Sequence, residues 1–135
     1  MYTMKEVCDQ VGISYEALRF YCNEGLVPNV KRRKNNYRAF DERDVRWLKG
    51  LQCLRKCGMS IKDMKGYMNL CLKGASTIPE RKCLLAVQKE YLLGKIDEVN
   101  QSIAYIDGKQ IYYDDVLSGE TPYSSSLLAI GDDDF

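Results

Sequence analysis

The chain has 135 residues, six cysteines and no histidine, and its formal net charge at neutral pH is +1. This length suits one domain, or one small domain with an extended element. No run approaches the roughly 20 apolar residues of a membrane-spanning helix, and the N-terminus lacks the apolar core of a signal peptide, so we expect a cytoplasmic protein with no membrane partner. In that compartment the cysteines should be reduced thiols rather than disulfides.

The charge is unevenly distributed along the chain. Residues 1–62 carry 13 Lys and Arg against 7 Asp and Glu, residues 63–118 carry 7 against 8, and residues 119–135 carry none against 4. A local excess of cations suits the neutralisation of phosphate groups. The N-terminal part is therefore the candidate for binding a nucleic acid.

Two short helices are predicted at the N-terminus. The segment from Thr3 to Glu6 has the pattern of a capping box, and apolar residues follow it at helical spacing as far as Gly12. Ser14 begins a second helix, which ends near residue 25. Two helices joined by so short a turn predict a helix-turn-helix, with the second as recognition helix.

A hairpin and two further helices complete the predicted DNA-binding domain, residues 1–74. Residues 26–40 have no helical period, and Asn35-Asn36 suits a tight hairpin because Asn tolerates positive φ, so this segment is the predicted wing. The helices over residues 41–74 are separated by Gly58. The first of them has an apolar stripe of Trp47, Leu48, Leu51 and Leu54.

The sequence pattern of residues 75–118 predicts one long helix. Thr77 to Glu80 has a capping-box pattern with Pro in the first turn. A helix of about forty residues spans roughly 60 Å, and so small a domain cannot bury its apolar seam, so we expect a second copy of the chain to cover it. The seam has the alternating spacing of 4 and 3 that is typical of a coiled coil, and consists of Leu92, Ile96, Val99, Ile103 and Ile106.

The acidic tail, residues 119–135, is expected to be disordered. Its last residues include the run Asp132-Asp133-Asp134. An apolar segment, Leu127 to Ile130, could dock elsewhere.

Several motifs occur in an order that resembles the MerR, or mercury-resistance-regulator, family of bacterial transcription factors, over residues 2 to about 110. They are SYEALRFY at 14–21, GLVP at 25–28, YRAF at 37–40, DV at 44–45 and GMSI at 58–61. The resemblance implies a mainly α-helical protein, with a winged helix-turn-helix followed by a long antiparallel coiled-coil dimerisation helix. It also implies a homodimer that binds a promoter and distorts the spacer between its recognition elements, so that RNA polymerase can engage both.

Two positions depart from the family pattern. Cys22 stands where the family usually has Glu, so a polar contact that fixes the recognition helix is in doubt. Asn36 stands where Gly is usual, which should stiffen the tip of the wing. A two-fold dimer further implies an operator that is an inverted repeat.

The predicted DNA contacts come from the recognition helix and the wing. Tyr15 and Arg19 are four residues apart and share a helix face. The family pattern suggests that the Tyr21 hydroxyl contacts a phosphate. The wing should grip the flanking backbone or minor groove through Lys31, Arg32, Arg33, Lys34, Tyr37 and Arg38. The alternative is that this helix face and this run of charges are solvated surface that makes no contact with DNA.

The candidate sensor is Cys53, with Cys57 as a possible helper. Cys53 falls off the apolar stripe of its helix, and Lys49 and Lys56 lie one turn away, where positive charge favours the reactive thiolate. Its place also resembles the sensor cysteine of the aldehyde- and thiol-stress branch of the family. Cysteines four apart on a helix are too distant for a simple disulfide. Three cysteines that do lie on or beside apolar stripes, Cys8, Cys22 and Cys71, are expected to act as small buried hydrophobes.

Three alternatives stay open at this level. The family's metal sensors place cysteines after the long helix, whereas residues 84–135 contain none, so we predict neither a metal site nor a cofactor; two thiolates on successive turns could still share a soft metal ion. A small apolar ligand could bind in the dimer interface. A helical adaptor without DNA binding would use the same helices. An enzyme is not expected, because no nucleophile-base pairing and no phosphate-cradling glycine loop is present.

Overall fold

The computed structural model describes residues 1–128, which fall into two compact units, Met1–Leu92 and the segment from Leu93 onward. The predicted acidic run Asp132 to Asp134, and half of the apolar segment at 127–130, lie outside the described residues. Within residues 1–128 we find no helix that is both long enough and apolar enough to cross a membrane.

The first unit opens with the predicted helix-turn-helix, α1 (Met4–Val11) and α2 (Tyr15–Asn23). The capping box is formed: the Glu6 amide donates to Thr3 Oγ1 (3.2 Å) and the Thr3 amide donates to Glu6 Oε1 (3.0 Å). Gly12 ends α1 with a φ of 74°, in the left-handed region that glycine adopts without strain. Ser14 then accepts a hydrogen bond from the Ala17 amide (3.1 Å) and begins α2.

The wing is a two-stranded antiparallel hairpin, β1 (Lys31–Arg32) and β2 (Arg38–Ala39), in which Arg32 pairs with Arg38. The Asn36 amide donates to the Arg33 carbonyl (2.8 Å), and Asn36 itself has a φ of 69°. A turn followed by a left-handed residue is a common three-residue hairpin connection, and Asn is among the few side chains that tolerate it. Asn36 thus occupies the one position of this turn that requires a positive φ.

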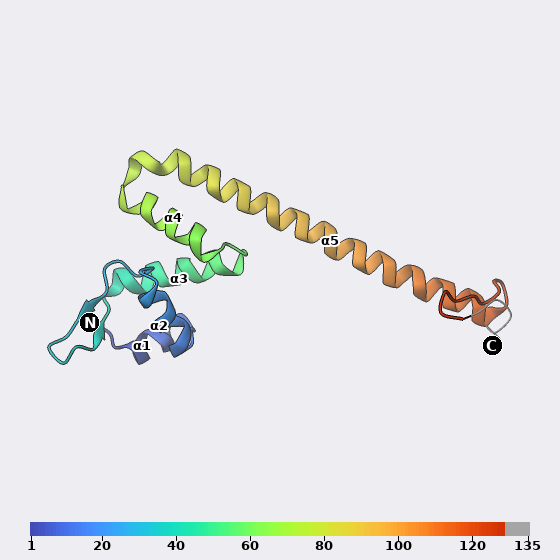
Figure 1. The fold of residues 1–135 in the computed structure, drawn as a ribbon, viewed down its shortest axis with the longest axis horizontal. Coiled ribbons are helices and arrows are strands. Elements are labelled where there is room, and N and C mark those ends of the chain that lie inside the picture. The colour runs from blue at the N-terminus through green and yellow to red at the C-terminus, as the bar shows by residue number, and fades with distance from the viewer. Residues whose placement is uncertain (129–135) are drawn as a thin grey trace. The chain divides into compact units, whose positions relative to one another are not determined.

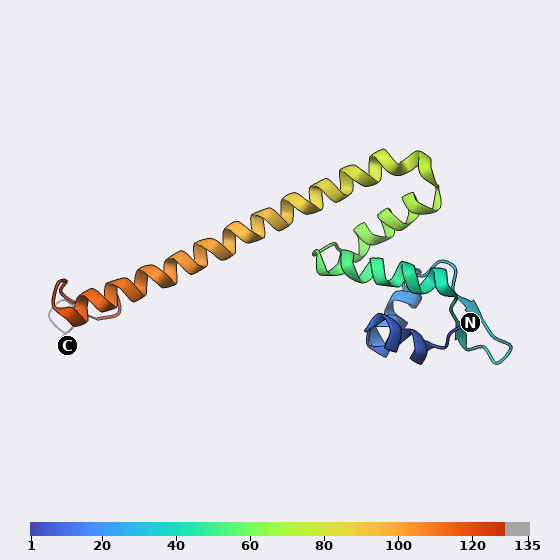
Figure 2. The ribbon, with the colours of Figure 1, turned by 180° about the vertical axis from the view of Figure 1, so that it is seen from behind.

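Helix α3 (Glu42–Lys56) packs on α1 of the helix-turn-helix, and α4 (Ile61–Leu72) packs on α3. In Figures 1 and 2, which view the molecule from opposite sides, α3 lies between the α1–α2 pair and α4, and the wing projects near the N-terminus. The predicted stripe of α3 is inward: Leu48 and Leu51 are fully buried, and Trp47 donates from Nε1 to the Leu26 carbonyl (2.6 Å). The fully buried side chains of this core are Val7, Leu18, Leu26, Phe40, Leu48, Leu51 and Met64.

The long helix α5 (Ile78–Ser118) has 41 residues and follows a short 3-10 turn, η1 (Ala75–Thr77). The capping box predicted from Thr77 takes another form. The Thr77 hydroxyl donates to the Leu70 carbonyl (2.5 Å), so it satisfies the C-terminal end of α4, and Arg81 Nε donates to its oxygen (3.1 Å). The 3-10 turn before α5 brings this side chain back onto α4.

The described part of the acidic tail, residues 119–128, folds back towards the end of α5. Gly119, with a φ of 84°, ends α5, and the Glu120 amide donates to the Asp115 carbonyl (2.9 Å). The chain then turns back, so that the Ser124 amide donates to the Tyr112 hydroxyl oxygen (2.8 Å). Residues 119–124 are therefore held against the last turns of α5 by local hydrogen bonds.

Candidate nucleic-acid interface

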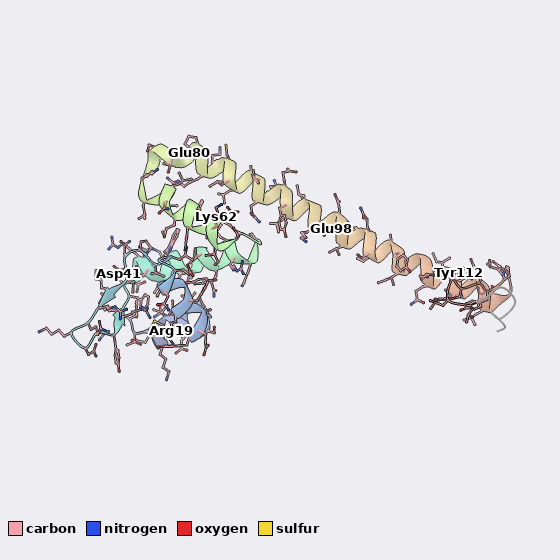
Figure 3. The ribbon with its side chains drawn as sticks, in the orientation of Figure 1. Arg19, Asp41, Lys62, Glu80, Glu98 and Tyr112 are labelled. Atoms are coloured by element: carbon pink, nitrogen blue, oxygen red, sulfur yellow. The ribbon has the colours of Figure 1, made fainter. Side chains whose placement is uncertain are left out.

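Helix α2 separates its side chains into a buried and an exposed face. Leu18 is fully buried and Tyr21 is 7% exposed, whereas Arg19 is exposed and Tyr15 is 53% exposed. Arg19 and Tyr15 therefore project from the recognition helix as predicted. Figure 3 shows Arg19 at the opposite end of the first unit from Glu80.

Tyr21, whose hydroxyl is predicted to contact a phosphate, is largely buried. Its ring belongs to the hydrophobic core, because it lies on the same face of α2 as Leu18. Any contact with DNA is limited to the small part that remains accessible. The neighbouring Phe20, which was not among the predicted residues, is 45% exposed instead.

A cleft of about 400 Å³ lies between the start of α1, the start of α2 and the wing. It brings together five of the nine predicted contact residues, while Arg19, Tyr21, Lys31 and Lys34 lie outside its lining. Lys5, in the first turn of α1, also lines the cleft and was not among the predicted contact residues. The lining residues are Thr3, Met4, Lys5, Tyr15, Arg32, Arg33, Asn35, Asn36, Tyr37 and Arg38.

Hydrogen bonds to the backbone hold two arginines of the wing in place. Arg32 Nη1 donates to the Asn36 carbonyl (2.8 Å) across the hairpin. Arg33 Nη2 donates to the Met1 carbonyl at 3.4 Å. Neutral oxygens thus fix the guanidinium groups without neutralising their charge, which suits them to a phosphate backbone.

Lys31 is held differently from the other wing cations. Its Nζ lies 3.4 Å from Asp41 Oδ2, and Arg43 Nη2 lies 3.2 Å from the same oxygen. The Asp44 backbone amide, together with these two cations, lowers the pKa of Asp41 to about 2. The Lys31 charge is therefore shared with a carboxylate, which makes Lys31 a weaker candidate for a phosphate contact than its neighbours.

The candidate sensor region is the end of α3 and the turn that follows it. Cys53 is exposed, as its place off the apolar stripe predicted, and Cys57 is half-buried at the C-terminal cap of α3. The side chain of Gln88 on α5 donates from Nε2 to the Cys57 carbonyl (2.6 Å). The exposed thiol thus lies one helical turn before a direct contact with α5.

The other cysteines fall into two groups. Cys8, Cys22 and Cys71 are half-buried, and burial raises the pKa of the Cys8 and Cys22 thiols. Cys83 is exposed on α5. Across residues 1–128, no three His, Cys, Asp or Glu side chains come together as a metal site would require.

The predicted seam lies on the surface of the single chain. Ile96, Val99, Ile103 and Ile106 are between 49% and 57% exposed. Leu92, which belongs to the first unit, is half-buried. Such a row of aliphatic side chains on one helix is the surface by which coiled coils associate.

Comparison with known proteins identifies the class of protein that this arrangement defines. A family model described as "MerR HTH family regulatory protein" matches residues 2–71. An HTH-type transcriptional regulator of Haemophilus influenzae is 38% identical over 112 residues, which is 83% of each chain. The chain belongs to the MerR family of HTH transcriptional regulators, and these relatives are regulators rather than enzymes.

Three further comparisons refine this assignment. The HTH-type transcriptional regulator AdhR of Bacillus subtilis is 35% identical over 88 residues, 65% of this chain and 63% of AdhR. The crystal structure of HiNmlR, a MerR family regulator lacking the sensor domain, bound to promoter DNA, has a TM-score of 0.72 at 36% identity, over 87% of this chain and 89% of HiNmlR. A structure from Listeria monocytogenes, described as a putative MerR family transcriptional regulator, has a TM-score of 0.75 at 29% identity. The match covers 88% of this chain and 90% of the Listeria chain.

Proposed function

We propose that the chain acts as a homodimer that binds an inverted-repeat promoter and distorts the DNA between the two half-sites, thereby controlling access of RNA polymerase. The observation that carries the proposal is the cleft between the recognition helix and the wing, which is lined by Lys5 and three arginines and has Arg19 on the adjoining helix. The guanidinium and ammonium groups match the negative charge of the DNA phosphates. The helix beside them has the size that fits the major groove of a duplex.

The resemblance to HiNmlR supports a duplex ligand, because that relative was crystallised on promoter DNA. By analogy, α2 would enter the major groove and the wing would contact the flanking backbone. Tyr15 and Arg19 are then the contacts nearest the bases, and Arg32, Arg33, Tyr37 and Arg38 hold the protein on the phosphates.

The exposed seam of α5 supports the homodimer. A single α-helix in water gains little stability without tertiary packing, so the aliphatic row from Ile96 to Ile106 needs a partner surface. A second copy of the same helix, running antiparallel, supplies one of the same chemistry. Two recognition helices related by a two-fold axis would read an inverted repeat.

We further propose that electrophiles or oxidants act on Cys53. The thiol is exposed, and the turn after its helix contacts α5 through Gln88. Alkylation or a mixed disulfide at Cys53 would add bulk close to this turn and could tilt the DNA-binding unit on its dimerisation helix.

Selection from a pool of random-sequence duplexes tests the DNA-binding proposal, because such a pool offers the protein every short operator at once. We expect the retained duplexes to contain an inverted repeat, and their affinity to fall steeply as salt rises, because each phosphate contact contributes about 0.9 to the slope of log affinity against log salt. A pool without enrichment, or a complex that is insensitive to salt, would contradict the proposal and favour a helical adaptor.

A further inference from the structure

We propose that Asn23 is a positioning residue that aims the Arg38 side chain of the wing at the DNA backbone. The inference rests on the proposed function and concerns how its wing is held. Asn23 is the last residue of α2, and Arg38 is the first residue of β2. Arg38 Nη2 donates to Asn23 Oδ1 at 2.7 Å, so a side-chain hydrogen bond links the recognition helix to the wing.

The contact orients Arg38 and leaves most of its hydrogen-bond donors available. A guanidinium group has five N–H donors in a planar fork, and the bond to Asn23 uses one of them. Arg38 is half-buried and lines the cleft together with Tyr15 and Tyr37, so its direction is restricted by neighbours on both the helix and the wing. A long side chain held in this way loses less rotamer freedom when DNA binds.

The acceptor is neutral, which leaves the positive charge of Arg38 for the DNA. Lys31, by contrast, faces the Asp41 carboxylate at 3.4 Å. The residue before Asn23 offers no negative charge either, because burial raises the pKa of the Cys22 thiol and keeps it protonated. An acidic side chain at position 23 would bind Arg38 more strongly and would compete with phosphate for it.

The link also fixes the wing relative to the recognition helix. The two residues are 15 positions apart in the chain, and the intervening segment contains the whole of β1 and the turn. Cys22 cannot make this link, because a thiol is a weak hydrogen-bond acceptor. In this chain Asn23 provides a side-chain hydrogen bond between α2 and the wing.

The test compares four variants of the full chain on a duplex selected by the parent protein: Asn23→Ala, Asn23→Asp, Arg38→Ala and the double variant Asn23→Ala with Arg38→Ala. Asn69→Ala, which makes the same change at an exposed site on α4, is the matched control. Affinity is measured by fluorescence anisotropy at several salt concentrations, and the melting temperature of each variant is recorded.

We expect Asn23→Ala to weaken binding about three- to tenfold, the cost of ordering one long side chain, with little change in salt slope. Arg38→Ala should lower the slope by about one. The double variant should bind no worse than Arg38→Ala alone. Asn23→Asp should bind more weakly than Asn23→Ala without a lower melting temperature.

Additive losses in the double variant would overturn the inference, since Asn23 would then act independently of Arg38. Parent-like binding by Asn23→Ala, Asn23→Asp or Arg38→Ala would overturn it as well. In each of these cases the parent still binds DNA in a salt-dependent way, so the proposed function stands. Loss of DNA binding by the parent itself would end the proposed function, and the inference with it.

Discussion

Two neighbouring aromatic residues of α2 differ sharply in their exposure to solvent. Phe20 is 45% exposed and Tyr21 is 7% exposed, although both are aromatic. Successive residues of a helix point about 100° apart, so Tyr21 falls on the face of Leu18 while Phe20 falls beside Arg19. An aromatic side chain in a DNA-binding motif is therefore not in itself evidence of a contact.

The cysteines allow a prediction at single-residue level. Iodoacetamide at pH 8 should modify Cys53 and Cys83, which are exposed, at least about tenfold faster than Cys22, because burial raises the Cys22 pKa and lowers its thiolate fraction. Mass spectrometry of peptides after timed quenching measures the rates. In guanidinium chloride, which unfolds the chain, the six thiols should react at similar rates. Modification of Cys22 in the folded protein as fast as that of Cys53 would show that the Cys22 thiol is accessible.

The start of α3 allows a prediction about pH at the level of one element. Asp41 caps this helix through the Asp44 amide (3.0 Å), and its pKa is about 2 in the folded chain against a usual 3.8. A lowered carboxyl pKa stabilises the fold above pH 4, and this contribution is lost as the pH falls towards 2.

Asp41→Asn keeps a capping oxygen but removes the charge. In low salt we expect the parent to melt at a higher temperature than Asp41→Asn at pH 5, and the difference to vanish near pH 2. Circular dichroism at 222 nm follows both proteins. A difference that is constant across this range would mean that the Asp41 charge does not contribute.

The turn between α3 and α4 depends on Gly58. Its φ is 84°, and a Cβ at this position would lie 2.9 Å from Cε1 of Tyr91. We expect Gly58→Ala to destabilise the protein by about 1–2 kcal/mol, from left-handed strain alone. Gly66→Ala in α4, where nothing lies within 4 Å, should instead stabilise it by about 0.5–1 kcal/mol. Urea unfolding measures both, and equal effects would contradict the account of the turn.

The helices and the wing were predictable because their signals are local. Caps such as Thr3 and Ser14, and the tolerance of Asn36 for positive φ, act within a few residues. The Thr77 box was misread because the hydroxyl bonds back to the Leu70 carbonyl, a partner seven residues earlier. The Asn23–Arg38 contact could not be predicted, since it depends on how the wing packs beside α2.

In the complete protein, the proposed homodimer depends on the seam. Val99 is 57% exposed on the single chain and lies on the seam, whereas Gln101 lies on the opposite side of the same turn. Val99→Glu should convert a dimer into a monomer or weaken it at least tenfold, because it places like charges in an apolar coiled-coil interface. Gln101→Glu adds the same charge and should leave the dimer intact.

Light scattering coupled to gel filtration over a range of concentrations measures both variants. A parent that remains monomeric at high concentration would refute the dimer. A Val99→Glu protein that is as dimeric as the parent would place the interface elsewhere. The expected outcome is a dimeric parent and a dimeric Gln101→Glu variant beside a dissociating Val99→Glu variant.

We propose that α2 reads DNA through Arg19, and an affinity measurement on two matched variants checks this role. Arg19→Ala and Lys82→Ala remove one exposed positive charge each, the first from the recognition helix and the second from α5 near Glu80, at the other end of the first unit (Figure 3). On the selected inverted repeat at fixed salt, Arg19→Ala should bind at least about tenfold more weakly than the parent, and Lys82→Ala within about twofold. Parent-like affinity of Arg19→Ala would contradict the account.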